Sequence, residues 1–149
     1  MEMARVSHRV GIAGEIGEIY RAMHEPAGLD GWWSTRSEGT PEIGRVLDLH
    51  FSDVVTLSFR IEALEENTRI RLHCVSGPGP WRDCRLEFSF EQDAGQVWVR
   101  LEHENAAASE EDFLYFSTKW TCYLLSLRDF IETGRGRPYP NDVKIHLGD

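Results

Sequence analysis

The stretch that decides the fold is residues 109–134, SEEDFLYFSTKWTCYLLSLRDFIETG. Its apolar side chains recur three and four residues apart, which places them on one face of an α-helix. Ser109 stands three residues before Asp112, as in a helix-capping box, and Gly134 is a residue type that ends helices. A helix of about 25 residues rises about 38 Å, enough to cross a small sheet. Its expected apolar face is formed by Phe113, Phe116, Trp120, Tyr123, Leu124, Leu127 and Ile131.

Upstream of this helix, apolar and polar residues alternate with a period of two, which is typical of strands with one buried face. The connections are too short for the helical crossovers that parallel strands need, so we expect an antiparallel meander. The longest run should turn every second residue from Val55 to Ala63 inward. The expected strands are residues 6–12, 46–51, 55–63, 69–74, 84–90 and 97–103.

Two short helices are expected after the first strand. Helical spacing runs through residues 14–23, and Pro26 ends that helix and opens a second one over residues 27–33. The polar residues 35–44 are expected to form a loop or a poorly formed edge strand. The whole chain, residues 1–149, then forms one two-layer α+β domain, with a small cavity between helix and sheet.

Composition and charge exclude several classes of function. The chain has 149 residues, of which 41% are hydrophobic, and this supports a core without metal or disulfide staples. Its net charge of -9 opposes binding to nucleic acid and to anionic membranes. No apolar run reaches the length of a membrane span, about 20 residues.

The cysteines and the N-terminus indicate the cellular setting. Cys74, Cys84 and Cys122 are odd in number and widely spaced, which disfavours a disulfide framework and a zinc site. A reduced, cytoplasmic location is the simpler interpretation. Residues 1–5 do not start a signal peptide.

Two motifs stand near the two ends of the chain. Ala22, Pro26, Leu29, Trp32 and Trp33 match the pattern Ala-Leu-Thr-x-Pro-x-x-Leu-x-x-Trp-Trp. Residues 119–134 are similar to the pattern Gly-Trp-x-x-x-Leu-x-x-Leu-x-x-x-Leu-Glu-x-Gly, with Lys119 in place of the first Gly and with Phe130-Ile131 near its last Leu. Together they resemble the START-like (SRPBCC) superfamily, and most of all its branch of homologues of the ATPase activator of the ninety-kilodalton heat-shock protein.

This resemblance brackets nearly the whole chain, and His103 stands where the branch often has a histidine. It implies a helix-grip (START/Bet v-like) fold, in which a curved antiparallel sheet wraps around a long C-terminal helix. It implies no single activity, because such proteins include ligand binders, cyclases, hydrolases and co-chaperone modules.

The residues expected to line the cavity come from the two short helices, the inner sheet face and the long helix. Trp32 and Trp33 either cover the cavity and stack on a ligand, or only pin the second short helix to the sheet. His103 either meets a ligand or bonds to a backbone carbonyl or a tyrosine hydroxyl. The predicted lining is Trp32, Trp33, Phe59, Leu72, Phe88, Val99, His103, Phe116, Trp120 and Tyr123.

Charged side chains are expected on the wet face of the sheet. The acidic side chains within residues 102–112 indicate a solvent-exposed face and a helix N-terminus rather than a metal site. Strand arginines should form cross-strand ion pairs with glutamates. Trp98 falls among them, and it is either a dimer anchor or is covered by a neighbouring arginine stem.

These observations favour a binding protein for a small, largely hydrophobic molecule, with no metal, cofactor or catalytic residue assigned. The nearly apolar inner face is the reason. A hydrolase or cyclase using the same cavity, and a chaperone-ATPase co-factor module, are the alternatives. Two or more titratable groups meeting in the pocket would favour the enzyme.

Overall fold

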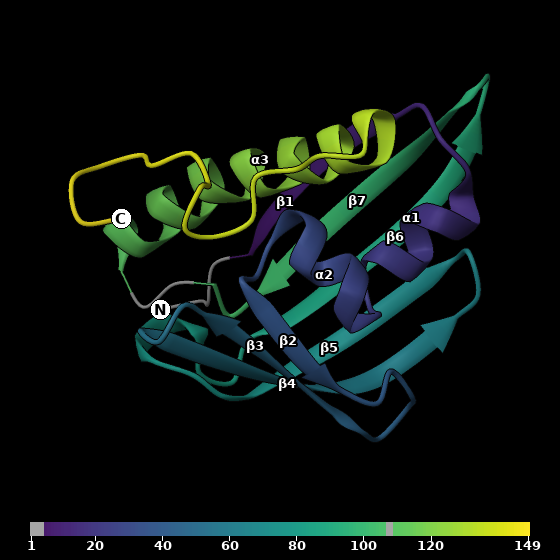
Figure 1. Ribbon diagram of the computed structural model, residues 1–149. Helices are drawn as coiled ribbons and strands as arrows, with labels where there is room; N and C mark the ends of the chain where they lie inside the picture. Colours follow the sequence, from purple (N-terminus) through teal and green to yellow (C-terminus); the bar gives the residue numbers. More distant parts are fainter. Residues whose placement is uncertain (1–4, 107–108) are drawn as a thin grey trace.

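A computed structural model describes residues 5–106 and 109–149 (Figure 1). The expectation about a signal peptide concerns mainly residues 1–4, which lie outside this range. The elements are β1 (Val6–Ile12), α1 (Ile16–Ala22), α2 (Pro26–Trp32), β2 (Arg36–Gly39), β3 (Val46–Phe51), β4 (Val55–Glu65), β5 (Arg69–Ser76), a 3-10 turn η1 (Gly79–Trp81), β6 (Arg85–Asp93), β7 (Gln96–Glu104) and α3 (Glu110–Thr133).

The strands form one sheet in the order β1-β7-β6-β5-β4-β3-β2, and every neighbouring pair is antiparallel. Consecutive strands from β2 to β7 are neighbours, and β1 adds to the β7 edge. Figure 1 shows α3 lying along one face of this curved sheet, with α1 and α2 beside it. The predicted α+β helix-grip fold is confirmed.

Local sequence explains where α3 and the last hairpin begin and end. The hydroxyl of Ser109 accepts a hydrogen bond from the backbone of Asp112 at 3.2 Å, which caps the first turn of α3. Gly134 follows the helix in the left-handed conformation, at φ 84°. Ala94 and Gly95 both have positive φ, and this suits the two-residue turn between β6 and β7.

Two details of the sheet differ from the expected pattern. Residues 36–39 form a short edge strand, which is the second of the two forms expected for the 35–44 segment. The inward placement of Ala63 is wrong, because a register shift lies between Ile61 and Ala63. This irregularity pairs Ala63 with Arg71 and turns Leu64 toward the core instead.

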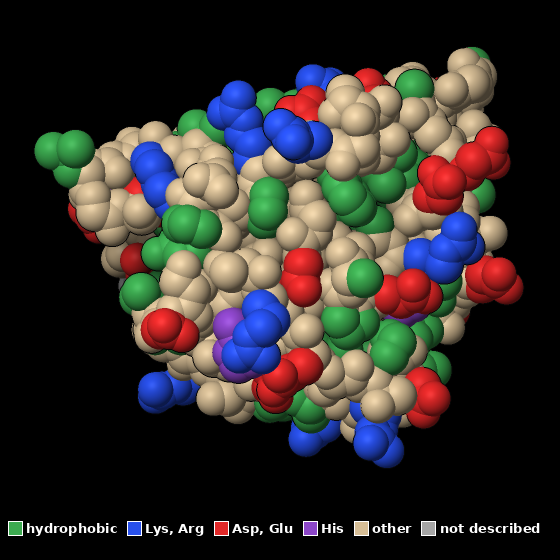
Figure 2. Space-filling model, viewed as in Figure 1, with side chains coloured by type: hydrophobic (Ala, Val, Ile, Leu, Met, Phe, Trp, Pro, Cys, Tyr) green, Lys and Arg blue, Asp and Glu red, His purple; other side chains and the backbone are tan. Residues whose placement is uncertain are grey.

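The outer face of the sheet carries the expected cross-strand ion pairs. Arg71 reaches Glu104 at 3.0 Å, Arg85 reaches Glu62 at 3.1 Å, and Arg69 reaches Glu87 at 2.9 Å. Exposed pairs of this kind each contribute up to about 1 kcal/mol. Figure 2 shows that basic and acidic side chains are also interspersed on the face that carries α2 and β2. Among the described residues, no helix is long and apolar enough to cross a membrane.

The two short helices are locked together where they cross. The Trp32 indole N–H donates a hydrogen bond to the carbonyl of Ala22 at 2.9 Å. Gly28 lies so close that a Cβ atom added there would overlap the backbone of Ala22. This contact fixes α2, and with it the two tryptophans at its C-terminal end.

Replacing Gly28 with alanine should therefore lower the free energy of unfolding by about 1–3 kcal/mol, the usual cost of overpacking. The matched control is Gly17→Ala in α1, where the new methyl would meet the flexible Arg21 side chain at 3.2 Å and make an ordinary contact with Asn67 Oδ1 at 3.7 Å. That change should be neutral or slightly stabilising, because alanine favours helices. Urea denaturation of both variants measures the difference, and equal stabilities would contradict the close approach of α1 and α2.

Candidate functional site

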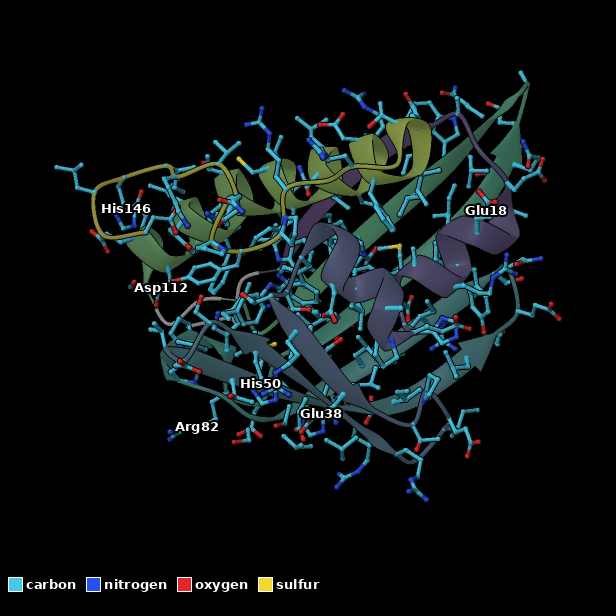
Figure 3. The ribbon with its side chains drawn as sticks, in the orientation of Figure 1. Glu18, Glu38, His50, Arg82, Asp112 and His146 are labelled. Carbon is cyan, nitrogen blue, oxygen red and sulfur yellow. The ribbon has the colours of Figure 1, made fainter. Side chains whose placement is uncertain are left out.

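A pocket of about 270 Å³ lies between the first half of α3, the turn from β3 to β4 and the C-terminal segment, residues 139–149. Its floor and walls are mostly apolar, and its polar groups come chiefly from α3 and the C-terminal segment. Figure 3 shows His146 on the loop of that segment. The apolar and aromatic lining is Phe51, Val54, Val55, Leu57, Trp81, Tyr115, Tyr123 and Tyr139, and the charged or titratable lining is Lys119, Asp142, His146 and Asp149.

Helical spacing brings three of these residues to the pocket together. Tyr115, Lys119 and Tyr123 are four residues apart on α3 and so share one face. Trp81 forms another wall from the turn η1. Its ring stacks on His103 at 5.3 Å and meets the edge of Phe116 at 4.9 Å, which holds it against the core.

Lys119 is a buried charge, with only 1% of its side chain exposed. Its ammonium group donates to Asp142 at 2.7 Å, to Asp149 at 2.7 Å and to the backbone carbonyl of Val143 at 2.8 Å. Burial alone would lower the pKa of Lys119, but the hydrogen bonds to the two carboxylates outweigh it and raise the pKa. Lys119 thus fastens the C-terminal segment to α3 and makes that segment a wall of the pocket.

His103 joins α3 to the sheet. It accepts a hydrogen bond at Nδ1 from the Trp120 indole N–H at 2.9 Å, so its own ring proton is assigned to Nε2. Burial lowers the pKa of His103 to about 4, and the ring is neutral at physiological pH. The sequence-based expectation of a backbone carbonyl or a tyrosine hydroxyl as the partner of His103 is wrong, because Trp120 takes that place. Nε2 is buried without a hydrogen-bond partner among the described residues.

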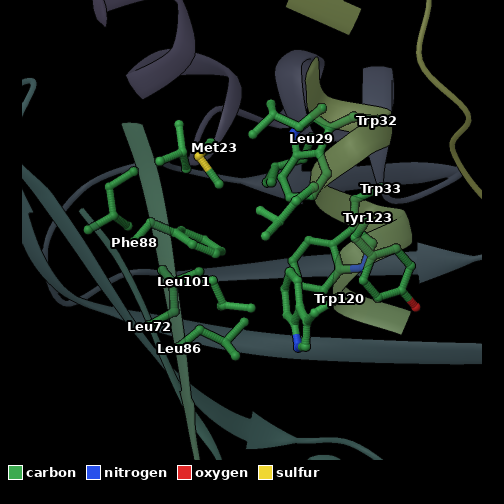
Figure 4. Packing of buried hydrophobic residues seen from close by; sticks show 14 of the residues in the cluster. Met23, Leu29, Trp32, Trp33, Leu72, Leu86, Phe88, Leu101, Trp120 and Tyr123 are labelled. Atoms are coloured by element: carbon green, nitrogen blue, oxygen red, sulfur yellow. The ribbon is translucent and has the colours of Figure 1, made fainter. Parts of the chain in front are cut away.

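Trp33 is the centre of an aromatic cluster and is only 1% exposed. The rings of Trp32, Phe51, Phe59, Trp81, Trp120 and Tyr123 surround it at centroid distances of 5.4–6.2 Å. Figure 4 shows Trp33, Trp120 and Tyr123 packed together beside α3. These contacts place Trp32 and Trp33 in the core, where they anchor α2.

The ten predicted lining residues are all buried, and they converge on the interior between α3 and the sheet. Of the ten, Tyr123 also lines the pocket at 9% exposure. The pocket therefore opens at the edge of the aromatic cluster, and the lining role of the other nine stays a prediction. They are Trp32, Trp33, Phe59, Leu72, Phe88, Val99, His103, Phe116 and Trp120.

Several pocket residues are not predicted from the sequence. Trp81 follows a breaker cluster, and Tyr139 and Asp142 lie beyond the last periodic segment, so no pattern singles them out. Lys119 does carry a signal. It directly precedes the apolar Trp120 and replaces a residue that is usually Gly in the resembling motif, and a lysine near a buried helix face needs a carboxylate partner.

The thiols lie away from this pocket. Cys74 and Cys84 are fully buried, Cys122 is half-buried, and all three are free. A hydrogen bond with Cys74 and burial raise the pKa of the Cys84 thiol, so Cys84 stays protonated. Such a buried thiol is a poor nucleophile.

Trp98 lies on the outer face of the sheet, as expected. The guanidinium of Arg9 stands 3.9 Å from the centre of its ring, and its indole N–H donates to Asp93 at 3.3 Å. Cover by a neighbouring arginine is thus present, through stacking of the charged group.

Comparison with known proteins finds the same architecture in several of them. The model of the family described as Activator of Hsp90 ATPase homolog 1-like protein matches residues 15–132. No curated protein matches the chain in sequence. The structure of the Aha1 dimer from Colwellia psychrerythraea is similar, with 27% identity and a TM-score of 0.80 over 90% of this chain and 100% of that one.

Two more distant structures share the fold. Protein SSP2350 from Staphylococcus saprophyticus has 18% identity and a TM-score of 0.77, over 89% of this chain and 95% of that one. CalU16 from Micromonospora echinospora has 20% identity and a TM-score of 0.71, over 86% of this chain and 74% of that one.

The buried neutral His103 should make the protein less stable in acid. An unfolded histidine binds a proton below about pH 6.5, whereas folded His103 does so only below about pH 4, so stability falls as pH drops between these values. From about pH 7.5 to about pH 5 this residue should account for about 2 kcal/mol of lost unfolding free energy.

The measurement is urea denaturation at both pH values for the wild type and for His103→Asn, whose amide oxygen takes the place of Nδ1 and can still accept from Trp120. The asparagine variant should lose about 2 kcal/mol less than the wild type over this interval. An identical loss in both proteins would contradict a low pKa at His103.

Proposed function

We propose that this chain, which belongs to the family of Activator of Hsp90 ATPase homolog 1-like proteins, binds a small, largely apolar molecule in the pocket beside Tyr123. The observation that carries the proposal is the lining, in which eight apolar or aromatic side chains enclose about 270 Å³. Pockets for small molecules are concave and mostly apolar, with a few placed polar groups. The volume suits a molecule of one or two rings.

The charges on the pocket wall support an uncharged ligand. Lys119 is neutralised by Asp142 and Asp149, and Lys144 adds a second ion pair to Asp142 at 2.6 Å. The two lysines and two aspartates sum to zero, so they offer no excess charge to an ionic ligand.

Titratable groups do meet in this pocket, which is the condition that favours a hydrolase or cyclase. These groups form hydrogen bonds and ion pairs with one another, however. The pKa of Lys119 is raised, so it stays protonated and cannot act as a base. Burial and the Asp149 carboxylate raise the pKa of Tyr115, which donates to Asp149 at 2.6 Å. We therefore place ligand binding before catalysis.

Stimulation of a chaperone ATPase is the second candidate, favoured by the family match and by the likeness to the Colwellia Aha1 protein. The test is the ATP turnover of purified Hsp90 with increasing amounts of this protein. We expect turnover to stay at the level of Hsp90 alone. A saturable increase would put this function ahead of ligand binding.

Two narrower predictions about setting and assembly stay proposals. The Colwellia relative is a dimer, which supports a homodimer here. Trp98 is the candidate anchor, in competition with its stacking on Arg9 in the same chain. A reduced, cytoplasmic location fits the three free cysteines.

Filling the pocket should weaken binding without unfolding the protein. Val54 lines the pocket and is 74% exposed, so Val54→Trp adds a large ring at the rim with little strain on the core. Titration calorimetry with 2-acetylnaphthalene should show at least about tenfold weaker binding to this variant, a loss of about 1.4 kcal/mol.

The matched control is Ile43→Trp. Ile43 is also an exposed aliphatic residue, at 62%, but it precedes β3 and so lies at the far end of the β3–β4 hairpin from the pocket. This variant should bind like the wild type. Equal binding by all three proteins would place the ligand elsewhere and refute the proposed site.

A further inference from the structure

The charged groups of the pocket have little left to offer a ligand. All three protons of the Lys119 ammonium group are engaged, by Asp142, Asp149 and the carbonyl of Val143. Both oxygens of the Asp142 carboxylate accept from lysines. Asp149 accepts from Tyr115, Lys119 and the backbone N–H of Ile145. Recognition therefore depends on the neutral polar groups.

Tyr123 supplies the most buried neutral polar group of the lining. Tyr123 is 9% exposed, and its hydroxyl donates its proton to none of the described residues, while the Trp33 indole N–H lies close to its oxygen. Burial raises the pKa of Tyr123, so the hydroxyl keeps its proton at physiological pH. Because Tyr123 lines the pocket, this proton is available to a ligand.

A second unpaired donor lies behind Tyr123. The indole N–H of Trp33 is buried and has no hydrogen-bond partner of normal geometry among the described residues. It acts on the Tyr123 hydroxyl and favours the ionised form, against the larger effect of burial. Figure 4 shows the Trp33 and Tyr123 rings side by side. An indole N–H can only donate, so it leaves the tyrosine proton free to point into the pocket.

We infer that the ligand carries a neutral hydrogen-bond acceptor, such as the carbonyl oxygen of a ketone, ester or amide, and that the Tyr123 hydroxyl selects it by donating to that oxygen. This inference rests on the proposed ligand-binding function and names its ligand class. An anionic acceptor is disfavoured because the Lys119 ammonium group has no free proton to offer it and because the net charge of the chain is -9. An ammonium ligand would need a free carboxylate, whereas Asp142 and Asp149 are both paired with Lys119.

The test compares two ligands of one shape. 2-Acetylnaphthalene and 2-isopropenylnaphthalene differ only in an oxygen atom against a CH₂ group, so their affinities isolate the acceptor. The wild type should prefer the ketone by about three- to tenfold, the range of one neutral hydrogen bond. Titration calorimetry gives both dissociation constants.

Tyr123→Phe removes only the hydroxyl and should abolish this preference by weakening the ketone alone. Tyr20→Phe is the matched control, because Tyr20 is also 9% exposed but packs against His24 and Phe90, and Tyr20 is not among the pocket residues. It should keep the preference. Thermal melts of both variants verify the fold.

The outcomes separate the inference from the function on which it rests. Equal binding of the two compounds by the wild type overturns the inference and leaves the binding function standing. A preference that persists in Tyr123→Phe overturns the role of Tyr123. If neither compound binds the wild type, the proposed function fails and the inference fails with it. An indole N–H signal of Trp33 that moves more with the ketone than with its isostere supports the donor pair.

Discussion

The hydrogen bond from Trp120 to His103 is the interaction on which the site depends. It joins α3 to β7 inside the protein, at 2.9 Å between two fully buried side chains. Burial keeps the ring neutral, so Nδ1 can accept this bond, and a neutral ring can stack on Trp81 without the cost of burying a charge. Trp81 in turn forms a wall of the pocket. This one hydrogen bond thus positions both α3 against the sheet and the Trp81 ring at the pocket wall.

The many aromatic side chains explain why the pocket lies at the edge of the space between α3 and the sheet and not at its centre. Six rings surround Trp33 and occupy the space between α3 and the sheet. The pocket lies where the β3–β4 turn and the C-terminal segment meet α3. There a buried lysine and two aspartates hold the segment in place, and the tyrosine hydroxyl faces inward.

The sequence predicts the elements well because periodicity reports burial directly. The alternation in β3 to β7 and the helical spacing in α3 each specify one buried face, and Ser109 and Gly134 define the ends of the helix. The irregularity near Ala63 is not visible, because alternation carries no signal for one extra residue. The segment 139–149 is not predictable either. It has no period and is placed by two aspartates that bind Lys119 across the fold.

The site itself was predictable only in part. The predicted lining includes Tyr123 and the rings behind it, because these residues lie on the periodic apolar faces. Pocket walls made by turns, such as Trp81 and Val54, depend on tertiary packing that no local pattern encodes.

The most direct test of the account is a crystal structure of the protein with 2-acetylnaphthalene bound. The account predicts density for the two rings between Trp81 and Tyr123, with the carbonyl oxygen within about 3 Å of the Tyr123 hydroxyl. Density for the compound outside this pocket, or in it with the carbonyl turned away from Tyr123 toward solvent, would contradict it.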